Sequence, residues 1–175
     1  MEPVELYTSA TDWAAEKVAG AAKRLEAPTP CDDWNVRTLV SHMIDTQQYF
    51  AAKARGQDAP LPKPMPPDLV HDDPLGAYNT AVADTLDAFN SPGGVEKAGI
   101  GVGIAFSDSM IHGWDVATAT GQDATMPEEL AAAAFEMIHG RFTPEQREGV
   151  FKEEVEVADD ASVQDKLLAY SGRTP

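Results

Sequence analysis

The sequence predicts an all-α protein, a four-helix bundle with a C-terminal helical extension. Four stretches carry apolar residues at helical spacing over a length that suits bundle helices, and residues that favour helix caps or breaks bound them. These stretches lie near residues 5–26, 35–55, 74–90 and 103–120. A chain of 175 residues is long enough to bury a proper core, and we expect a single domain over residues 1–175.

The charge balance argues against two classes of partner. Acidic residues outnumber basic ones 29 to 13, which gives a formal net charge of −16. That charge repels the phosphates of nucleic acids and anionic membranes, so neither is expected as a partner. The N-terminal residues are acidic and mixed, and no apolar run approaches the roughly 20 residues that span a bilayer. One cysteine, Cys31, fits a reducing compartment, so we expect a cytoplasmic protein.

The first two predicted helices are separated by a proline-containing break. Apolar residues recur at helical spacing from Leu6 to Leu25, and the segment 27–30, Ala-Pro-Thr-Pro, stops the pattern. Asn35 is a favourable N-cap for the second helix, and Trp34 before it can pack on Leu39 as a hydrophobic staple. The apolar stripe of this helix is formed by Val36, Leu39, Val40, Met43 and Phe50.

A long proline-rich segment follows, and two more helices lie beyond it. Residues 56–74 contain six prolines and read as an extended linker, long enough for the helices on either side to run parallel. Asp73 and Pro74 cap the third helix, which ends at 91–94, Ser-Pro-Gly-Gly. The alternating glycines at 99, 101 and 103 indicate a flexible approach to the fourth helix.

The C-terminal residues predict shorter elements. Thr125 and Glu128 have the spacing of a capping box, which would start a fifth helix. Further expected elements are a short helical turn capped by Thr143 and Gln146, an extended piece at 151–157 and a last helix at 161–170.

Three residues form a candidate metal site. Asp108 and His112 are four residues apart, which places them on one helical face one turn apart, and His42 lies at the edge of the second helix's apolar stripe. Two histidines and a carboxylate hold zinc in many enzymes with a fourth position open, and the same set can hold iron, nickel or manganese. The alternative is a surface ion pair and a boundary histidine. Asp115 either orients His112 or is an ordinary surface acid.

The segments around these residues resemble a known family. Residues 30–42 are similar to the P-C-x-x-W-x-V-x-x-L-x-x-H segment of the mycothiol-dependent maleylpyruvate isomerase-like, DinB-type metal-binding proteins. Residues 108–121 resemble their acid-x-x-x-H-x-W-D-x-A-x-A-T-G helix, and residues 165–175 the D-R-L-L-A-x-x-G-R-x-P tail of one small actinobacterial branch. The resemblance implies a DinB-like four-helix bundle in which His42, Asp108 and His112 hold one divalent metal ion.

The resemblance has two departures. The characterised isomerase has a glutamate where this chain has Asp108, and aspartate is one methylene shorter. That isomerase also has a further C-terminal domain that helps to form its active site, for which this chain looks too short.

Cys31 lies beside a helix start with no obvious base nearby, and in the family pattern it looks structural, with nucleophilic catalysis as the alternative.

The function implied is a thiol-dependent transferase or isomerase. Its cosubstrate would be mycothiol, its metal zinc (with nickel, iron or manganese as alternatives), and its partners a small-molecule thiol and a small electrophile. A non-catalytic, stress-associated metal-binding protein and a metallohydrolase remain as alternatives, and a homodimer stays open.

Overall fold

Four long helices form the first of two compact units, residues 1–124 and 125–175. The computed structural model describes residues 1–147 and 150–175. The long helices are α1 (Pro3–Ala21), α2 (Val36–Ala54), α3 (Pro74–Asn90) and α5 (Gly101–Thr120), and a short α4 (Gly94–Ala98) precedes α5. The all-α class and the four-helix bundle are therefore confirmed. The single domain over residues 1–175 stays a prediction.

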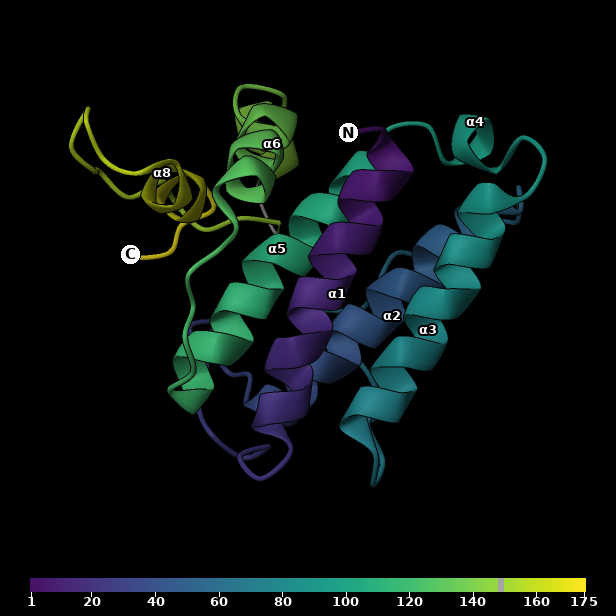
Figure 1. Ribbon diagram of the computed structural model, residues 1–175, viewed down its shortest axis with the longest axis horizontal. Coiled ribbons are helices and arrows are strands. Elements are labelled where there is room, and N and C mark those ends of the chain that lie inside the picture. Colours follow the sequence, from purple (N-terminus) through teal and green to yellow (C-terminus); the bar gives the residue numbers. More distant parts are fainter. Residues whose placement is uncertain (148–149) are drawn as a thin grey trace. The chain divides into compact units, whose positions relative to one another are not determined.

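The helix directions follow from the long linker between α2 and α3. Figure 1 shows α2 and α3 running in the same direction and α1 and α5 in the opposite one. Within the bundle α1 packs on α5, α2 packs on α3, and α2 also packs on α5. Antiparallel neighbours need only a short loop, whereas parallel neighbours need a connection that returns along the bundle, and residues 55–73 supply it.

Helix α1 is shorter than predicted, ending at Ala21 rather than near residue 26. The residues beyond it have another role. The carbonyls of Leu25 and Ala27 accept hydrogen bonds from the backbone N–H groups of Arg37 and Val36, at 2.8 and 3.0 Å. Those N–H groups belong to the first turn of α2 and have no partner within the helix. The loop thus completes the start of α2.

The predicted cap of α2 is confirmed. The side-chain oxygen of Asn35 accepts hydrogen bonds from the backbone N–H and the hydroxyl of Thr38, both at 2.9 Å. Replacing Asn35 with alanine should lower the free energy of unfolding by about 1 kcal/mol, because one N–H group loses its acceptor. Urea unfolding checks this, with Asn35→Ser as the control that keeps an acceptor. Equal losses in both variants would contradict the capping role.

Helix α5 is buried on nearly all sides. It begins at Gly101, two residues earlier than predicted, and its buried residues include Phe106, Ile111 and Val116, which lie on different faces. At Gly113 the approach of α1 is very close, since a Cβ there would lie 2.5 Å from a ring carbon of Trp13. This position therefore requires glycine for packing reasons.

The second unit contains α6 (Glu128–Ile138), α7 (Pro144–Arg147) and α8 (Val163–Tyr170), which confirms the helical extension. The predicted capping box is wrong, because α6 begins after Pro127 with no side-chain cap. Ser162 caps α8 through the N–H of Asp165.

The remaining expectations for this unit have mixed outcomes. Residues 151–157 are not a strand, although the N–H of Val155 donates to the carbonyl of Ala169 at 3.0 Å. The predicted capping role of Gln146 concerns a side chain that lies outside the described part of the structure, so it stays a prediction. Among the helices in the described parts of the chain, none combines the length and apolarity needed to cross a membrane.

Candidate metal centre

The structure brings His42, Asp108 and His112 together. One possible ligand atom from each lies within 4.8 Å of the others. The Oδ1 atom of Asp108 is 3.4 Å from Nε2 of His112 and 3.9 Å from Nε2 of His42. The two residues of α5 meet by their i, i+4 spacing, and the packing of α2 on α5 supplies the third.

The donor set fits a divalent cation. Tetrahedral zinc with bonds of about 2.0–2.2 Å places neighbouring ligand atoms about 3.3–3.5 Å apart. The pair formed by Asp108 and His112 already meets this spacing, whereas Nε2 of His42, 3.9 Å from Oδ1 of Asp108, must move closer to reach it. Nδ1 of His42 and Oδ2 of Asp108 are buried without a hydrogen-bond partner among the described residues. Buried polar atoms are usually satisfied, and a cation bound by the Asp108 carboxylate would satisfy Oδ2, whereas Nδ1 of His42 lies on the other side of the ring from the nitrogen nearest Asp108.

The electrostatics of the site favour one ion pair in the metal-free protein. Burial alone would raise the pKa of Asp108, but the charge and hydrogen bond of His112, helped by His42, hold it well below its usual range. Burial alone would lower the pKa of His112, but Asp108, Asp115 and Cys31 together raise it well above its usual value. His112 is therefore protonated and Asp108 ionised before a metal binds.

Asp115 contacts the ring of His112 at Nδ1, on the side opposite to the Nε2 atom that faces Asp108. Its side chain is fully buried, and its Oδ2 atom lies 2.9 Å from Nδ1 of His112. A histidine that donates from Nδ1 keeps the lone pair of Nε2 for a metal on its other side. Of the two interpretations of Asp115, surface acid and orienting residue, the burial favours the second. The same oxygen accepts a hydrogen bond from Sγ of Cys31 at 3.3 Å.

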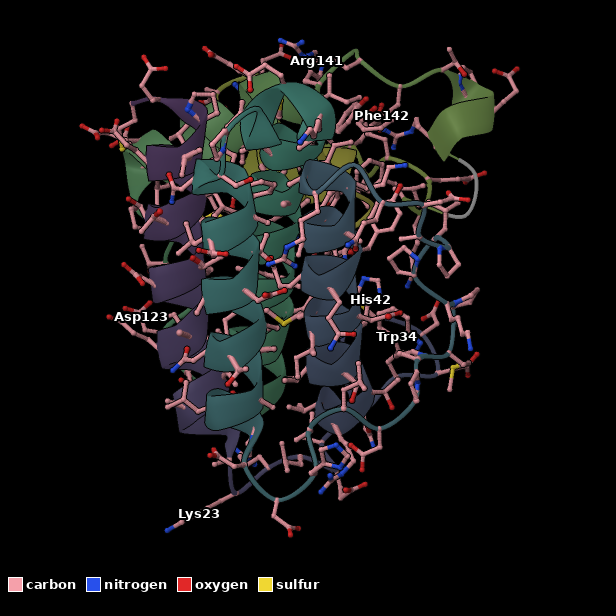
Figure 2. The ribbon with its side chains drawn as sticks, turned by 90° about the vertical axis from the view of Figure 1, so that its right-hand side faces the viewer. Lys23, Trp34, His42, Asp123, Arg141 and Phe142 are labelled. Carbon is pink, nitrogen blue, oxygen red and sulfur yellow. The ribbon has the colours of Figure 1, made fainter. Side chains whose placement is uncertain are left out.

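Two residues of the loop before α2 lie at the site although the sequence assigned them other roles. Cys31, expected to be structural, contacts Asp115. Trp34, expected to be a staple on Leu39, has its ring centroid 4.7 Å from that of His42 and 6.4 Å from that of His112. Figure 2 shows Trp34 beside His42. The sequence signal that could have placed them at the site is that they lie with His42 in residues 30–42, the segment that resembles the family.

Trp34 also joins the site to the proline-rich linker. Its Nε1–H donates to the carbonyl of Pro64 at 3.0 Å. The linker is further held along α2, because Oδ2 of Asp45 accepts from the N–H of Lys63 and the hydroxyl of Ser41 accepts from the N–H of Leu69. The linker therefore lies on the same side of α2 as Trp34.

Comparison with known proteins shows the family to which the chain belongs. The family model for the mycothiol maleylpyruvate isomerase N-terminal domain matches residues 7–117. The chain belongs to this family. The matched range includes His42, Asp108 and His112, and it lies within the first unit. The resemblance predicted from the sequence is therefore confirmed.

The relatives of this chain include two uncharacterized proteins of Mycobacterium tuberculosis. One is from strain CDC 1551 / Oshkosh and the other from strain H37Rv. Each is 29% identical to this chain over 99% of both sequences, so the likeness also covers the second unit. No solved structure matches the chain.

Proposed function

We propose that His42, Asp108 and His112 hold one divalent cation, and that the protein uses a low-molecular-weight thiol to transform a small electrophile. Zinc is the cation we favour, with nickel, iron and manganese as alternatives, and mycothiol is the proposed thiol. The observation that carries the proposal is the convergence of the three ligand atoms within 4.8 Å, inside the range that the family model matches.

Each residue has a distinct part in this proposal. The three ligands leave a coordination position open, where a bound cation lowers the pKa of a thiol. Asp115 holds the ring of His112 through Nδ1 and directs Nε2 toward Asp108. The indole of Trp34 covers His42 and excludes water from that side. Because Oδ1 of Asp108 comes within 3.4 Å of Nε2 of His112, aspartate is long enough here despite the glutamate of the characterised isomerase.

The setting we propose follows from the same chemistry. A low-molecular-weight thiol works in its reduced form, so we place the protein in the cytoplasm, where thiols are kept reduced. We propose small molecules as its partners, and not nucleic acid or membranes, in line with the net charge of −16. A homodimer would be compatible with this function.

The proposal is tested by metal analysis followed by thiol titration. Protein purified without a histidine tag or added metal should carry close to one divalent cation per chain. Mycothiol titrated into the metal-loaded protein should give a calorimetric binding signal that vanishes in the chelated form. Equal binding to both forms would contradict coordination of the thiol. Thiol binding without turnover of any electrophile would assign the protein to non-catalytic metal binding.

Metal affinity should rise with pH. The raised pKa of His112 means that a cation must displace a proton, whereas Asp108, whose pKa is lowered, is already ionised. For one proton released, affinity strengthens by up to about tenfold per pH unit below the raised His112 pKa and levels off above it. Competition with a chromogenic chelator between pH 5.5 and 8 measures this, and an affinity that does not change with pH would contradict it.

A further inference from the structure

The imidazole of His112 faces two different donor sets. Its Nε2 atom points to Asp108 and His42, and its Nδ1 atom points to Asp115. On the Nδ1 side, possible ligand atoms of Cys31, His112 and Asp115 also lie within 4.8 Å of one another. We propose that these three residues form a second cation site, selective for soft, thiolate-preferring cations. It goes beyond the function proposed above and shares only His112 with that site.

The distances on this side suit coordination. Oδ2 of Asp115 is 2.9 Å from Nδ1 of His112 and 3.3 Å from Sγ of Cys31. With bonds of about 2.0–2.3 Å to nitrogen, oxygen and sulfur, tetrahedral coordination places such atoms about 3.3–3.6 Å apart. The 2.9 Å contact therefore holds its two ligand atoms slightly closer than a cation would, and the 3.3 Å contact already meets the range. Small outward shifts make room for it.

The ligand types distinguish the two sites. Thiolate sulfur favours soft cations such as Cd²⁺ and Cu⁺ and also binds Zn²⁺, whereas a set of imidazole and carboxylate ligands without sulfur also suits harder cations. Asp115 is fully buried and contributes a negative charge, and Cys31 is half-buried. The chain has one cysteine, so no other thiol in the chain can compete for the cation.

The two sites exclude each other because they share one ring. When the cation binds on the Nδ1 side, the thiol proton and the Nδ1 proton of His112 leave to solvent. The remaining ring proton stays on Nε2 and donates to Oδ1 of Asp108, 3.4 Å away. A neutral imidazole offers one lone pair, on one nitrogen at a time. The softness of the cation then decides which side of His112 is used.

Cadmium is the probe that tests this inference. Cd²⁺ titrated into metal-free protein in thiol-free buffer should produce the ultraviolet thiolate-to-cadmium charge-transfer band, which Cys31→Ser removes. Asp115→Asn should weaken the cadmium affinity read from the band by about tenfold or more. The matched variant His42→Ala, which damages only the first site, should keep the band and its affinity. Circular dichroism of each variant checks that the helices are intact.

Several results would overturn the inference. The first is a wild-type protein without the band. The second is a band that is lost in His42→Ala. A third is an apparent affinity that increases with protein concentration, because that would mean a cation bridging the cysteines of two chains. Zinc retention by Cys31→Ser, measured in the same preparations, reports on the first site separately, so the failure of one site is distinguishable from the failure of the other.

Discussion

His112→Ala is expected to remove metal retention completely, from about one cation per chain to background. The ring supplies Nε2 to the proposed site and is the group that Asp115 holds in place. Asp108 and His42 would remain, but two ligands on separate helices hold a zinc ion poorly. Elemental analysis after gel filtration measures the loss. His42→Ala should weaken retention severely, because it removes one ligand and leaves the supported pair on α5.

A histidine outside the site provides the control for this experiment. His71 is exposed in the linker with a backbone φ of 50°, a conformation that asparagine tolerates well. His71→Asn should therefore keep both the fold and the metal. If it lost the metal as completely as His112→Ala, retention would depend on general histidine binding and the proposed site would be wrong.

Gly113→Ala is expected to cost about 1–3 kcal/mol of unfolding free energy. The added Cβ would lie 2.5 and 3.0 Å from two ring carbons of Trp13 and 3.2 Å from Cβ of Ala14. Trp13 is only 8% exposed, so its ring has little room to move and α1 must shift away from α5. Urea unfolding of the metal-free protein measures the effect.

A second glycine in a helix, Gly20, provides the control that distinguishes the steric clash at position 113 from a general effect of alanine. The three atoms nearest to a Cβ at Gly20 all belong to the end of the Gln122 side chain, which can turn away. Gly20→Ala should therefore cost much less than Gly113→Ala, because alanine favours helix by up to about 1 kcal/mol and offsets the displaced hydrogen bonds of Gln122. Equal losses at both positions would contradict the close approach of α1 and α5.

The helices were predictable because their signals are local. Asn35 and Asp73 cap their helices through hydrogen bonds three residues ahead, which depend on little outside the segment. The end of α1 was not predictable, because residues beyond Ala21 leave the helix to place the carbonyls of Leu25 and Ala27 at the start of α2. These hydrogen bonds depend on the tertiary structure, which the spacing of apolar residues along the sequence does not reveal.

The candidate site also has a part that could be predicted from the sequence and a part that could not. The pairing of Asp108 with His112 follows from helix geometry alone, and a helix-edge histidine at 42 was a reasonable third member. The roles of Asp115, Cys31 and Trp34 depend on how the loop before α2 folds back over α5. The distance from Sγ of Cys31 to Oδ2 of Asp115 joins residues 84 positions apart, and no pattern within either segment specifies it.

The burial of α5 has an evolutionary consequence. A helix packed on nearly every side tolerates few substitutions, so we expect the segment that carries Asp108, His112 and Asp115 to change slowly in evolution. The loop that carries Trp34 and the linker that carries Pro64 border the same site from the surface, where changes in length and composition are tolerated. Divergence in substrate choice among descendants of this protein should therefore concentrate in residues 56–73 rather than at Cys31, Trp34 or the proposed ligands.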